Sequence, residues 1–410
     1  MQVGEYRGEA DYTYRIIEGD TILDGPFVMQ KSDLEALLNE EDASFLFKGA
    51  FQDDYAHGPW RFQFGAFESE SESQVVDYEY RVLISGVQEE ATGNLEAGKP
   101  DGEWNFTVNR IKDSEIESTL FKSTIRFENG IPQRNFKIEN ENSTLVGRFL
   151  RDGLAHDEWS LYTTNGLGAT ESWQFEEGVL TSITVENDGG ITSIPIYGAN
   201  IRPTKTITLD SRYINALQLQ QNPADSTSIF DTQMPLLLGE NAGHYQKIDG
   251  ILSELGKSSF LPEFKVKVPY FPMDSTATAQ MDSIAIQYKK SQAISDSLLN
   301  NSQLNLLKRS DVEALFLFET VKKLSAEFLE PLDKIVTYYQ EDILEFAPLS
   351  QIISRTFPNG KPSKEIQIEK NGNVQVRRTF ILPDAERYNF EGNELTSVAQ
   401  LSDYAFRGLD

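Results

Sequence analysis

Residues 47–60 read FKGAFQDDYAHGPW, and two later stretches repeat the pattern of a glycine, a polar turn and a tryptophan. Residues 92–104 read TGNLEAGKPDGEW, and residues 146–159 read VGRFLRDGLAHDEW. Aligned on the tryptophans, a fourth and weaker unit is DGPF at residues 24–27, with Phe27 in the tryptophan position. Internal repeats of this kind indicate a supersecondary unit that buries its apolar face against its neighbours. We therefore expect a repeated sheet, which more often forms a surface than an active site.

Apolar and polar residues alternate after each aromatic residue, as in Trp60-Arg61-Phe62-Gln63-Phe64 and Trp104-Asn105-Phe106-Thr107-Val108. A period of two predicts strands with one buried face, which the aromatic residues share. Glycine-rich stretches such as residues 97–102 predict hairpin turns. Sequential strands usually pair with their neighbours, so residues 1–202 are predicted to form an antiparallel meander. Further strand-like segments are Tyr6 to Ile17, Tyr78 to Ser85, Leu120 to Phe127, Arg134 to Ile138, Trp173 to Phe175 and Leu180 to Val185, with a short helix expected over Asp33 to Asn39.

The pattern changes near Pro203, and residues 203–350 are predicted to be mainly helical. Asp274-Ser275 is typical of a helix N-cap, and Ser310 to Glu313 forms a capping box before a second helix. We expect a helical hairpin over residues 275–346, with a kink or break at Pro331. An apolar stripe on the second helix indicates a buried face, and it comprises Leu317, Val321, Leu324, Phe328, Leu332, Ile335, Tyr339 and Ile343. Shorter helices are expected over Arg212 to Gln221 and Tyr245 to Leu255, and a strand over Phe264 to Val268.

Residues 351–410 are predicted to hold a β-hairpin and a tail. Asn371-Gly372 suits a type I′ turn between Ile366–Ile368 and Val374–Val376. The overall prediction is an α+β protein in which a repeat sheet precedes a helical region and a short terminal hairpin. The chain has 410 residues, which is long enough for two or three domains.

The formal net charge is -27 and is unevenly distributed. Residues 1–200 contain 37 acidic and 15 basic residues, so the repeat region carries most of the surplus. A negative field repels phosphate backbones and anionic lipid surfaces, so nucleic acid and membrane are not expected as partners. A basic protein or Ca²⁺ would fit this charge, although a high acidic charge also serves solubility alone. The chain has no cysteine, which excludes disulfides and thiolate chemistry.

The repeat resembles the MORN repeat, and the match is carried by Phe47, Gly49, Phe51, Asp53, His57, Gly58 and Trp60. The second unit matches at Gly93, Leu95, Gly98, Lys99, Gly102 and Trp104, with Asp101 in the histidine position, and the third at Gly147, Phe149, Gly153, His156 and Trp159. The third unit departs from the pattern by one extra residue and by Asp157 in place of glycine. The likeness covers residues 10–180, and weakly 355–382, and is to bacterial MORN-repeat variants, some of which are described as antitoxins. It implies an extended sheet of hairpins that serves as an interaction surface.

Candidate binding residues are Trp60, Trp104, Trp159, His57 and His156. The tryptophans could line a ligand groove, but large aromatic residues on a sheet usually form its core. His57 and His156 share one repeat position, which favours a structural role such as bonding to a turn carbonyl or stacking on the tryptophan. The sequence contains no Gly-x-Ser-x-Gly, Walker or His-Glu-x-x-His motif, so we expect no catalytic residue, metal or cofactor.

We therefore expect a non-enzymatic module for protein–protein interaction, or a scaffold. The alternatives are a carboxylate-dependent glycan hydrolase or carbohydrate-binding protein, and an antitoxin-like protein that neutralises a basic partner. No stretch has the length and apolarity of a membrane span. Five Asp-Ser/Thr tripeptides, such as Asp20-Thr21-Ile22, resemble O-glycosylation sites of some bacterial periplasms. This favours a periplasmic or cell-envelope location over a cytoplasmic one.

Overall fold

The fold was analysed in a computed structural model of the chain. It describes residues 1–32, 43–67, 73–76, 79–82, 84–163, 169–187, 190–198, 200–220, 233–299, 329–330, 332–356, 365–369 and 377–381. The predicted helix at Asp33 to Asn39 and the kink at Pro331 lie outside these residues. Contacts between Cα atoms divide the chain into two compact units, Met1–Ile201 with Thr206–Ile214 and Gln221–Lys267, and Arg202–Lys205 with Asn215–Gln220 and Val268–Asp410.

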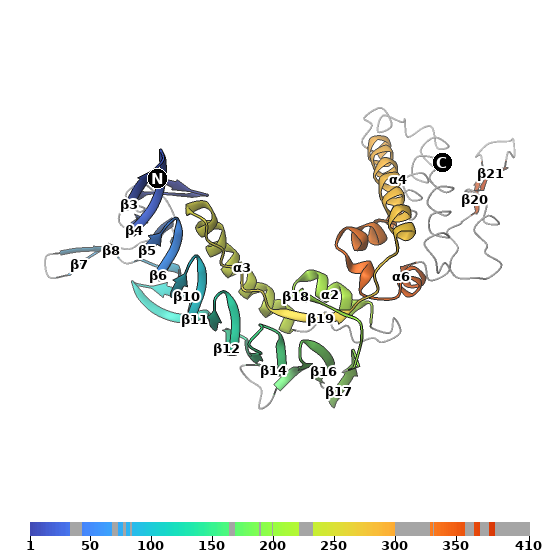
Figure 1. The fold of residues 1–410 in the computed structure, drawn as a ribbon, viewed down its shortest axis with the longest axis horizontal. Coiled ribbons are helices and arrows are strands. Elements are labelled where there is room, and N and C mark those ends of the chain that lie inside the picture. Colours follow the sequence, from blue (N-terminus) through green and yellow to red (C-terminus); the bar gives the residue numbers. More distant parts are fainter. Residues whose placement is uncertain are drawn as a thin grey trace. The chain divides into compact units, whose positions relative to one another are not determined.

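A sheet of 15 strands dominates the described chain, together with a few helices (Figure 1). Twelve of its strands pair antiparallel in the order of the chain, from β3 to β16 with the separate pair β7–β8 left out. This confirms the predicted antiparallel sheet and the α+β class. The strands of the sheet are β3 (Glu9–Ile17), β4 (Asp20–Lys31), β5 (Ala43–Gln52), β6 (Tyr55–Phe67), β9 (Gly86–Glu96), β10 (Lys99–Lys112), β11 (Glu115–Glu128), β12 (Ile131–Asn140), β13 (Ser143–Phe149), β14 (Ala155–Thr163), β15 (Ala169–Glu176), β16 (Val179–Asn187), β17 (Gly190–Pro195), β18 (Thr204–Thr208) and β19 (Lys265–Pro269).

Three further pairs of strands stand apart from this sheet: β1 (Gln2–Val3) with β2 (Tyr6–Arg7), β7 (Ser73–Val76) with β8 (Glu79–Val82), and β20 (Glu365–Glu369) with β21 (Arg377–Ile381). The predicted C-terminal strand Ile366–Ile368 lies in β20, whose partner is β21. The predicted strand Val374–Val376 lies outside the described residues. The helices are α2 (Ser211–Gln218), α3 (Gln233–Leu255), α4 (Ser275–Leu299), the 3₁₀ helix η3 (Ile343–Glu345) and α6 (Leu349–Thr356), and residues 332–340 are also helical.

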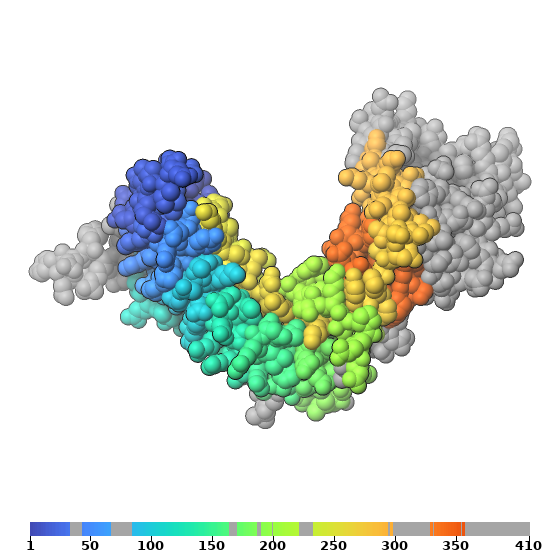
Figure 2. All heavy atoms as spheres, in the orientation of Figure 1, coloured from blue at the N-terminus to red at the C-terminus, as the bar shows by residue number. Residues whose placement is uncertain are grey.

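Helix α3 covers one face of the sheet, which we call the inner face (Figures 1 and 2). Its first turn is held at β15, where the buried carboxylate of Glu171 accepts a hydrogen bond from Met234 N at 3.1 Å. Near its other end, the Glu254 carboxylate accepts a hydrogen bond from Gly4 N. The helix begins twelve residues earlier than the predicted Tyr245, at Gln233. Residues such as Met234, Leu237 and Leu238 in this earlier part are buried, because the sheet supplies the apolar partner.

The segment after α3 runs back along the turns of the hairpins. Its backbone N–H groups donate to one turn carbonyl after another, from Lys257 to Asp54 (3.0 Å), Ser259 to Gly98 (3.0 Å), Lys265 to Gly153 (3.2 Å) and Lys267 to Gly178 (2.8 Å). We call residues 257–267 the return segment. It thus holds the turns of four hairpins, β5–β6, β9–β10, β13–β14 and β15–β16, while α3 covers the inner face.

The second unit contains α4, residues 332–340, η3 and α6. Two hydrogen bonds join α4 to residues 332–340, from Tyr288 Oη to Asp333 Oδ1 (2.5 Å) and from Tyr339 Oη to Asp282 Oδ1 (2.7 Å). The order of the partners is that of two antiparallel helices. Leu332, Ile335 and Ile343, members of the predicted apolar stripe, are buried. The hairpin over 275–346 stays a prediction, because its middle lies outside the described residues.

Candidate interaction surface

Each tryptophan of the repeat covers the glycine of its own hairpin. A Cβ atom placed on Gly49, Gly93 or Gly147 would come well under 3.0 Å from the ring of Trp60, Trp104 or Trp159. The indole Nε1 then donates to the carbonyl of the residue after that glycine: Ala50 (3.2 Å), Asn94 (2.8 Å) and Arg148 (3.1 Å). The two most regular features of the repeat thus form one contact, in which only glycine leaves room for the indole.

The same contact places the three tryptophans in the core. Their exposed fractions are 2%, 0% and 0% for Trp60, Trp104 and Trp159. The rings therefore do not line a ligand groove in the described residues, in agreement with the expectation that large aromatic residues on a sheet form its core. The physical reason is that the inner face lies under α3, Phe260 and Phe264, with the Trp104 and Phe260 ring centroids 4.4 Å apart.

A β-bulge precedes each tryptophan and needs a left-handed residue. The register of the strand pair shifts at this point in the three tryptophan hairpins and in β3–β4. The residue two before the aromatic residue has a positive φ: Gly25 (111°), Gly58 (75°), Gly102 (73°) and Asp157 (58°). Asp is among the few non-glycine residues that adopt this conformation readily. This explains why Asp157 can replace the glycine of the other units.

In each unit, the side chain of the residue before the bulge residue contacts the next hairpin. Asp24, Asp101 and His156 accept hydrogen bonds from Asp53 N (3.4 Å), Asn129 N (3.2 Å) and Glu177 N (3.2 Å), each at the first residue of the following turn. His57, in the same position, lies 3.5 Å from the Glu96 carboxylate of the following hairpin. The predicted structural role thus takes a different form for His156, because its Nδ1 accepts from a turn N–H and does not bond to a turn carbonyl. These side chains join hairpins and do not converge on a ligand.

Two hairpins of the same kind escaped the repeat pattern. In β11–β12 the bulge residue is Arg134 (φ 61°), Phe136 stands in the tryptophan position and Ile125 in the glycine position. In β15–β16, Trp173 faces Ile183. Neither hairpin carries the Gly–Trp pair. The sequence therefore indicated them only by the spacing between the bulge and Phe136 and by the alternation of buried residues.

The outer face of the sheet is polar and is exposed or half-buried, apart from a few residues such as Ser160. One row of paired residues crosses ten strands in register: Lys48, Arg61, Thr92, Asn105, Thr124, Lys137, Val146, Ser160, Ser172 and Thr184. Thr124 donates to Asn105 Oδ1 at 2.8 Å, and Ser160 and Ser172 both donate to Glu158 at 2.9 and 2.7 Å. These bonds, two of them between strands, fix the polar side chains in place, so the face is an ordered surface.

Both signs of charge occur on the outer face, where Arg61 pairs with Glu90 at 3.0 Å. Exposed acidic residues also occur at the ends of the hairpins, at Glu18, Asp53, Asp113, Glu141, Asp152 and Glu177. Acidic side chains suit these positions because turns are exposed and Asp tolerates a positive φ. The acidity predicted for the repeat region therefore borders the polar face.

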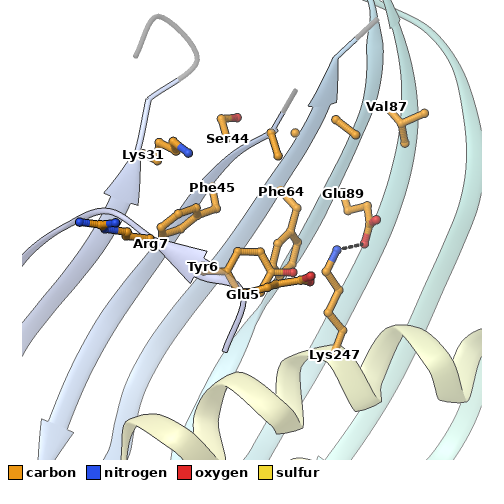
Figure 3. A pocket seen from close by; sticks show the side chains of 13 residues that line it. Glu5, Tyr6, Arg7, Lys31, Ser44, Phe45, Phe64, Val87, Glu89 and Lys247 are labelled. Carbon is orange, nitrogen blue, oxygen red and sulfur yellow. Dashed lines mark hydrogen bonds and ion pairs between the residues drawn. The ribbon is translucent and has the colours of Figure 1, made fainter. Parts of the chain in front are cut away.

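A pocket of about 300 Å³ opens at the N-terminal end of the sheet (Figure 3). The aromatic rings of Tyr6, Phe45 and Phe64 line it, and the Lys247 ammonium lies 3.8 Å from the Phe64 ring centroid and 3.2 Å from Glu89. Burial and the charge of Glu5 raise the pKa of Tyr6. With Lys247 held by Glu89 and the Tyr6 phenol kept protonated, the pocket shows no activated base or nucleophile among the described residues.

His244, which the repeat does not contain, packs between the rings of Phe106 and Phe121, each 4.5 Å away. Burial lowers its pKa, against the opposing charges of Glu89 and Glu240. It therefore serves as a packing residue on the side of α3 that faces the sheet. Among the described residues, no group of three or more His, Asp or Glu is arranged to hold a metal ion.

Comparison with known proteins adds no assignment. No model of a known protein family matches the chain, and no curated protein matches it. None of the described helices combines the length and apolarity needed to cross a membrane.

Proposed function

We propose that this protein is a non-enzymatic protein–protein interaction module, or scaffold, whose sheet presents its outer face to a partner. One observation carries the proposal. The chain covers the inner face with its own α3 and return segment, while the outer face presents an ordered polar surface across ten strands.

The rigidity of the sheet supports a binding role. Hairpins are joined through bulge side chains, turn carbonyls and the return segment, so the surface is held in one shape before a partner arrives. A pre-ordered surface loses less conformational entropy on binding. The exposed acidic residues at the hairpin ends favour a partner with a basic rim, because complementary potentials raise association rates.

The MORN-like resemblance is part of this proposal, since such arrays serve as interaction surfaces. We also propose a periplasmic or cell-envelope location on the basis of the Asp-Ser/Thr tripeptides. One of these, Asp274-Ser275-Thr276, has a structural role as well, because Asp274 Oδ1 accepts from Ala277 N at 2.8 Å as the N-cap of α4.

Site-specific photo-crosslinking tests the proposal. A photoreactive amino acid at Lys122 or Lys137 would report on the exposed outer face, and one at Leu236, exposed on α3, is the matched control. In a cell-envelope extract, we expect the two outer-face positions to crosslink to the same protein and Leu236 not to do so. Equal labelling from all three positions, or none from the outer face, would remove the proposal.

A further inference from the structure

The first hairpin, β3–β4, differs from the five that follow it in the sheet (β5–β6, β9–β10, β11–β12, β13–β14 and β15–β16) in the exposure of the side chain at one position. This position lies two residues after the glycine position on the first strand of each hairpin. It is 3%, 0%, 2%, 2% and 1% exposed at Phe51, Leu95, Phe127, Phe149 and Phe175, whereas Tyr14 of β3 is 53% exposed. The side chain at this position is thus exposed only in hairpin β3–β4.

The missing neighbour explains this difference. Phe51 packs edge-to-face against Phe27 of the preceding hairpin, with ring centroids 5.4 Å apart. No described strand pairs with the free edge of β3, and the return segment makes the first of its bonds to the turns at Asp54, in the second hairpin. Tyr14 therefore occupies a repeat interface to which the described residues supply no preceding unit.

Strand β3 is suited to pair with another strand. It has nine residues without Pro or Lys, two residue types by which natural proteins often block edge strands. Tyr12, Tyr14 and Ile16 alternate along it and are 40%, 53% and 68% exposed. An added strand would bond to the backbone and cover these side chains with every second residue of its own.

The charge around this edge determines the charge of the segment that it can bind. Glu9, Asp11, Glu18 and Asp20 are exposed on or beside β3. Arg15, the cation of the strand, already pairs with Asp24 at 2.9 Å and with Asp53. An acidic edge disfavours a second copy of this chain, whose net charge is -27.

We infer that β3 accepts an extended segment of a partner protein in which aromatic or aliphatic residues alternate with Lys or Arg. The apolar residues pack on Tyr12, Tyr14 and Ile16 in place of a preceding hairpin, and the basic residues face Glu9 and Asp11. This surface is separate from the outer face, so it stands whether or not the outer face binds a partner.

Binding of a synthetic peptide to the full chain tests this inference. The probe alternates Lys with Phe and Val, one control has the same composition with all Lys in one block, and another is methylated at alternate backbone nitrogens. We expect the alternating peptide to bind and to slow amide exchange in residues 9–17. Methylation or the block order should weaken binding at least tenfold.

Variants of the chain complete the test. Tyr14→Lys and Ile16→Lys should each weaken binding at least tenfold, whereas Ile191→Lys on β17, where the side chain is 74% exposed, should leave it unchanged. Equal binding of the block-ordered or the methylated peptide would mean that charge alone accounts for the binding, and it would overturn the inference. So would protection outside β3, or a wild-type dimer that Tyr14→Lys dissociates, since that would assign the edge to a second copy.

Discussion

Hairpins β9–β10 and β11–β12 have the same backbone and different side chains at the same two positions. The first pairs Gly93 with Trp104, and the second pairs Ile125 with Phe136. In β9–β10 a large residue is matched by a small one, whereas β11–β12 has two residues of more similar size. We therefore expect the combined volume of the two positions, together with the bulge beside them, to encode the repeat more than either residue alone.

The largest expected effect follows from overfilling hairpin β9–β10. Gly93→Ile places the side chain found at position 125 under the Trp104 ring, where even a Cβ comes too close. We expect a loss of about 3 kcal/mol or more in the free energy of unfolding, since overpacking typically costs about 1–3 kcal/mol and here the neighbour is a buried indole. Urea unfolding measures it. The control is Thr92→Val, at the residue before Gly93, whose side chain lies on the outer face. Its free energy of unfolding should stay within about 0.5 kcal/mol of the wild type.

Converting one hairpin into the other should recover part of that loss. Trp104→Phe alone leaves a cavity and frees the Asn94 carbonyl, at a cost of about 1–3 kcal/mol. Combined with Gly93→Ile, it should give a favourable coupling of about 1–3 kcal/mol in a double-mutant cycle. Additive effects of the two substitutions would contradict the size-matching account.

Hairpin β15–β16 extends the comparison, because the indole of Trp173 donates to the Glu171 carboxylate at 2.7 Å and not to a backbone carbonyl. Glu171→Ala leaves this buried indole and Met234 N without that acceptor, so we expect a loss of about 2 kcal/mol. Thermal unfolding against the exposed control Glu176→Ala measures the difference. A result as small as the control's would mean that α3 does not depend on this contact.

His244 lies between the two compared hairpins, on Phe106 of β10 and Phe121 of β11, and it should make their packing sensitive to pH. Because burial lowers its pKa, the unfolded chain binds the proton more readily as the pH falls below about 6.5. Its contribution to stability is therefore full above that pH and declines on acidification. We expect His244→Leu to lose less stability than the wild type between pH 7.5 and 5.5, as measured by urea unfolding at each pH.

The smallest effect concerns the bulge. Asp157→Gly should change stability by only a few tenths of a kcal/mol, because relief of the positive φ offsets the lost ion pair between Arg148 and Asp157 at 2.8 Å. Asp157→Val should cost more than about 1 kcal/mol, since a β-branched residue is strained there. Equal stability of the two variants in thermal unfolding would show that the left-handed conformation is not required.

Much of the sheet could be predicted, because alternation and hairpin turns are local signals. The strand-like segments around Phe121, Phe136, Trp173 and Ile183 all fall within observed strands. The candidate surface could not be found in the same way. Trp104 and Trp159 pack against Phe260 and Phe264 of the return segment, which is distant in the sequence. The outer row depends on the register between ten strands.

By itself the sequence determined the antiparallel hairpins, their turns and the acidic character of the first 200 residues, since each depends on neighbours a few positions away. Only the tertiary structure decided that glycine and tryptophan form one contact and that an aspartate or histidine holds the next hairpin. It alone decided which face stays open and that no described strand pairs with the second edge of β3. These features arise from contacts across strands and from a distant helix, and such contacts leave no fixed spacing in the chain.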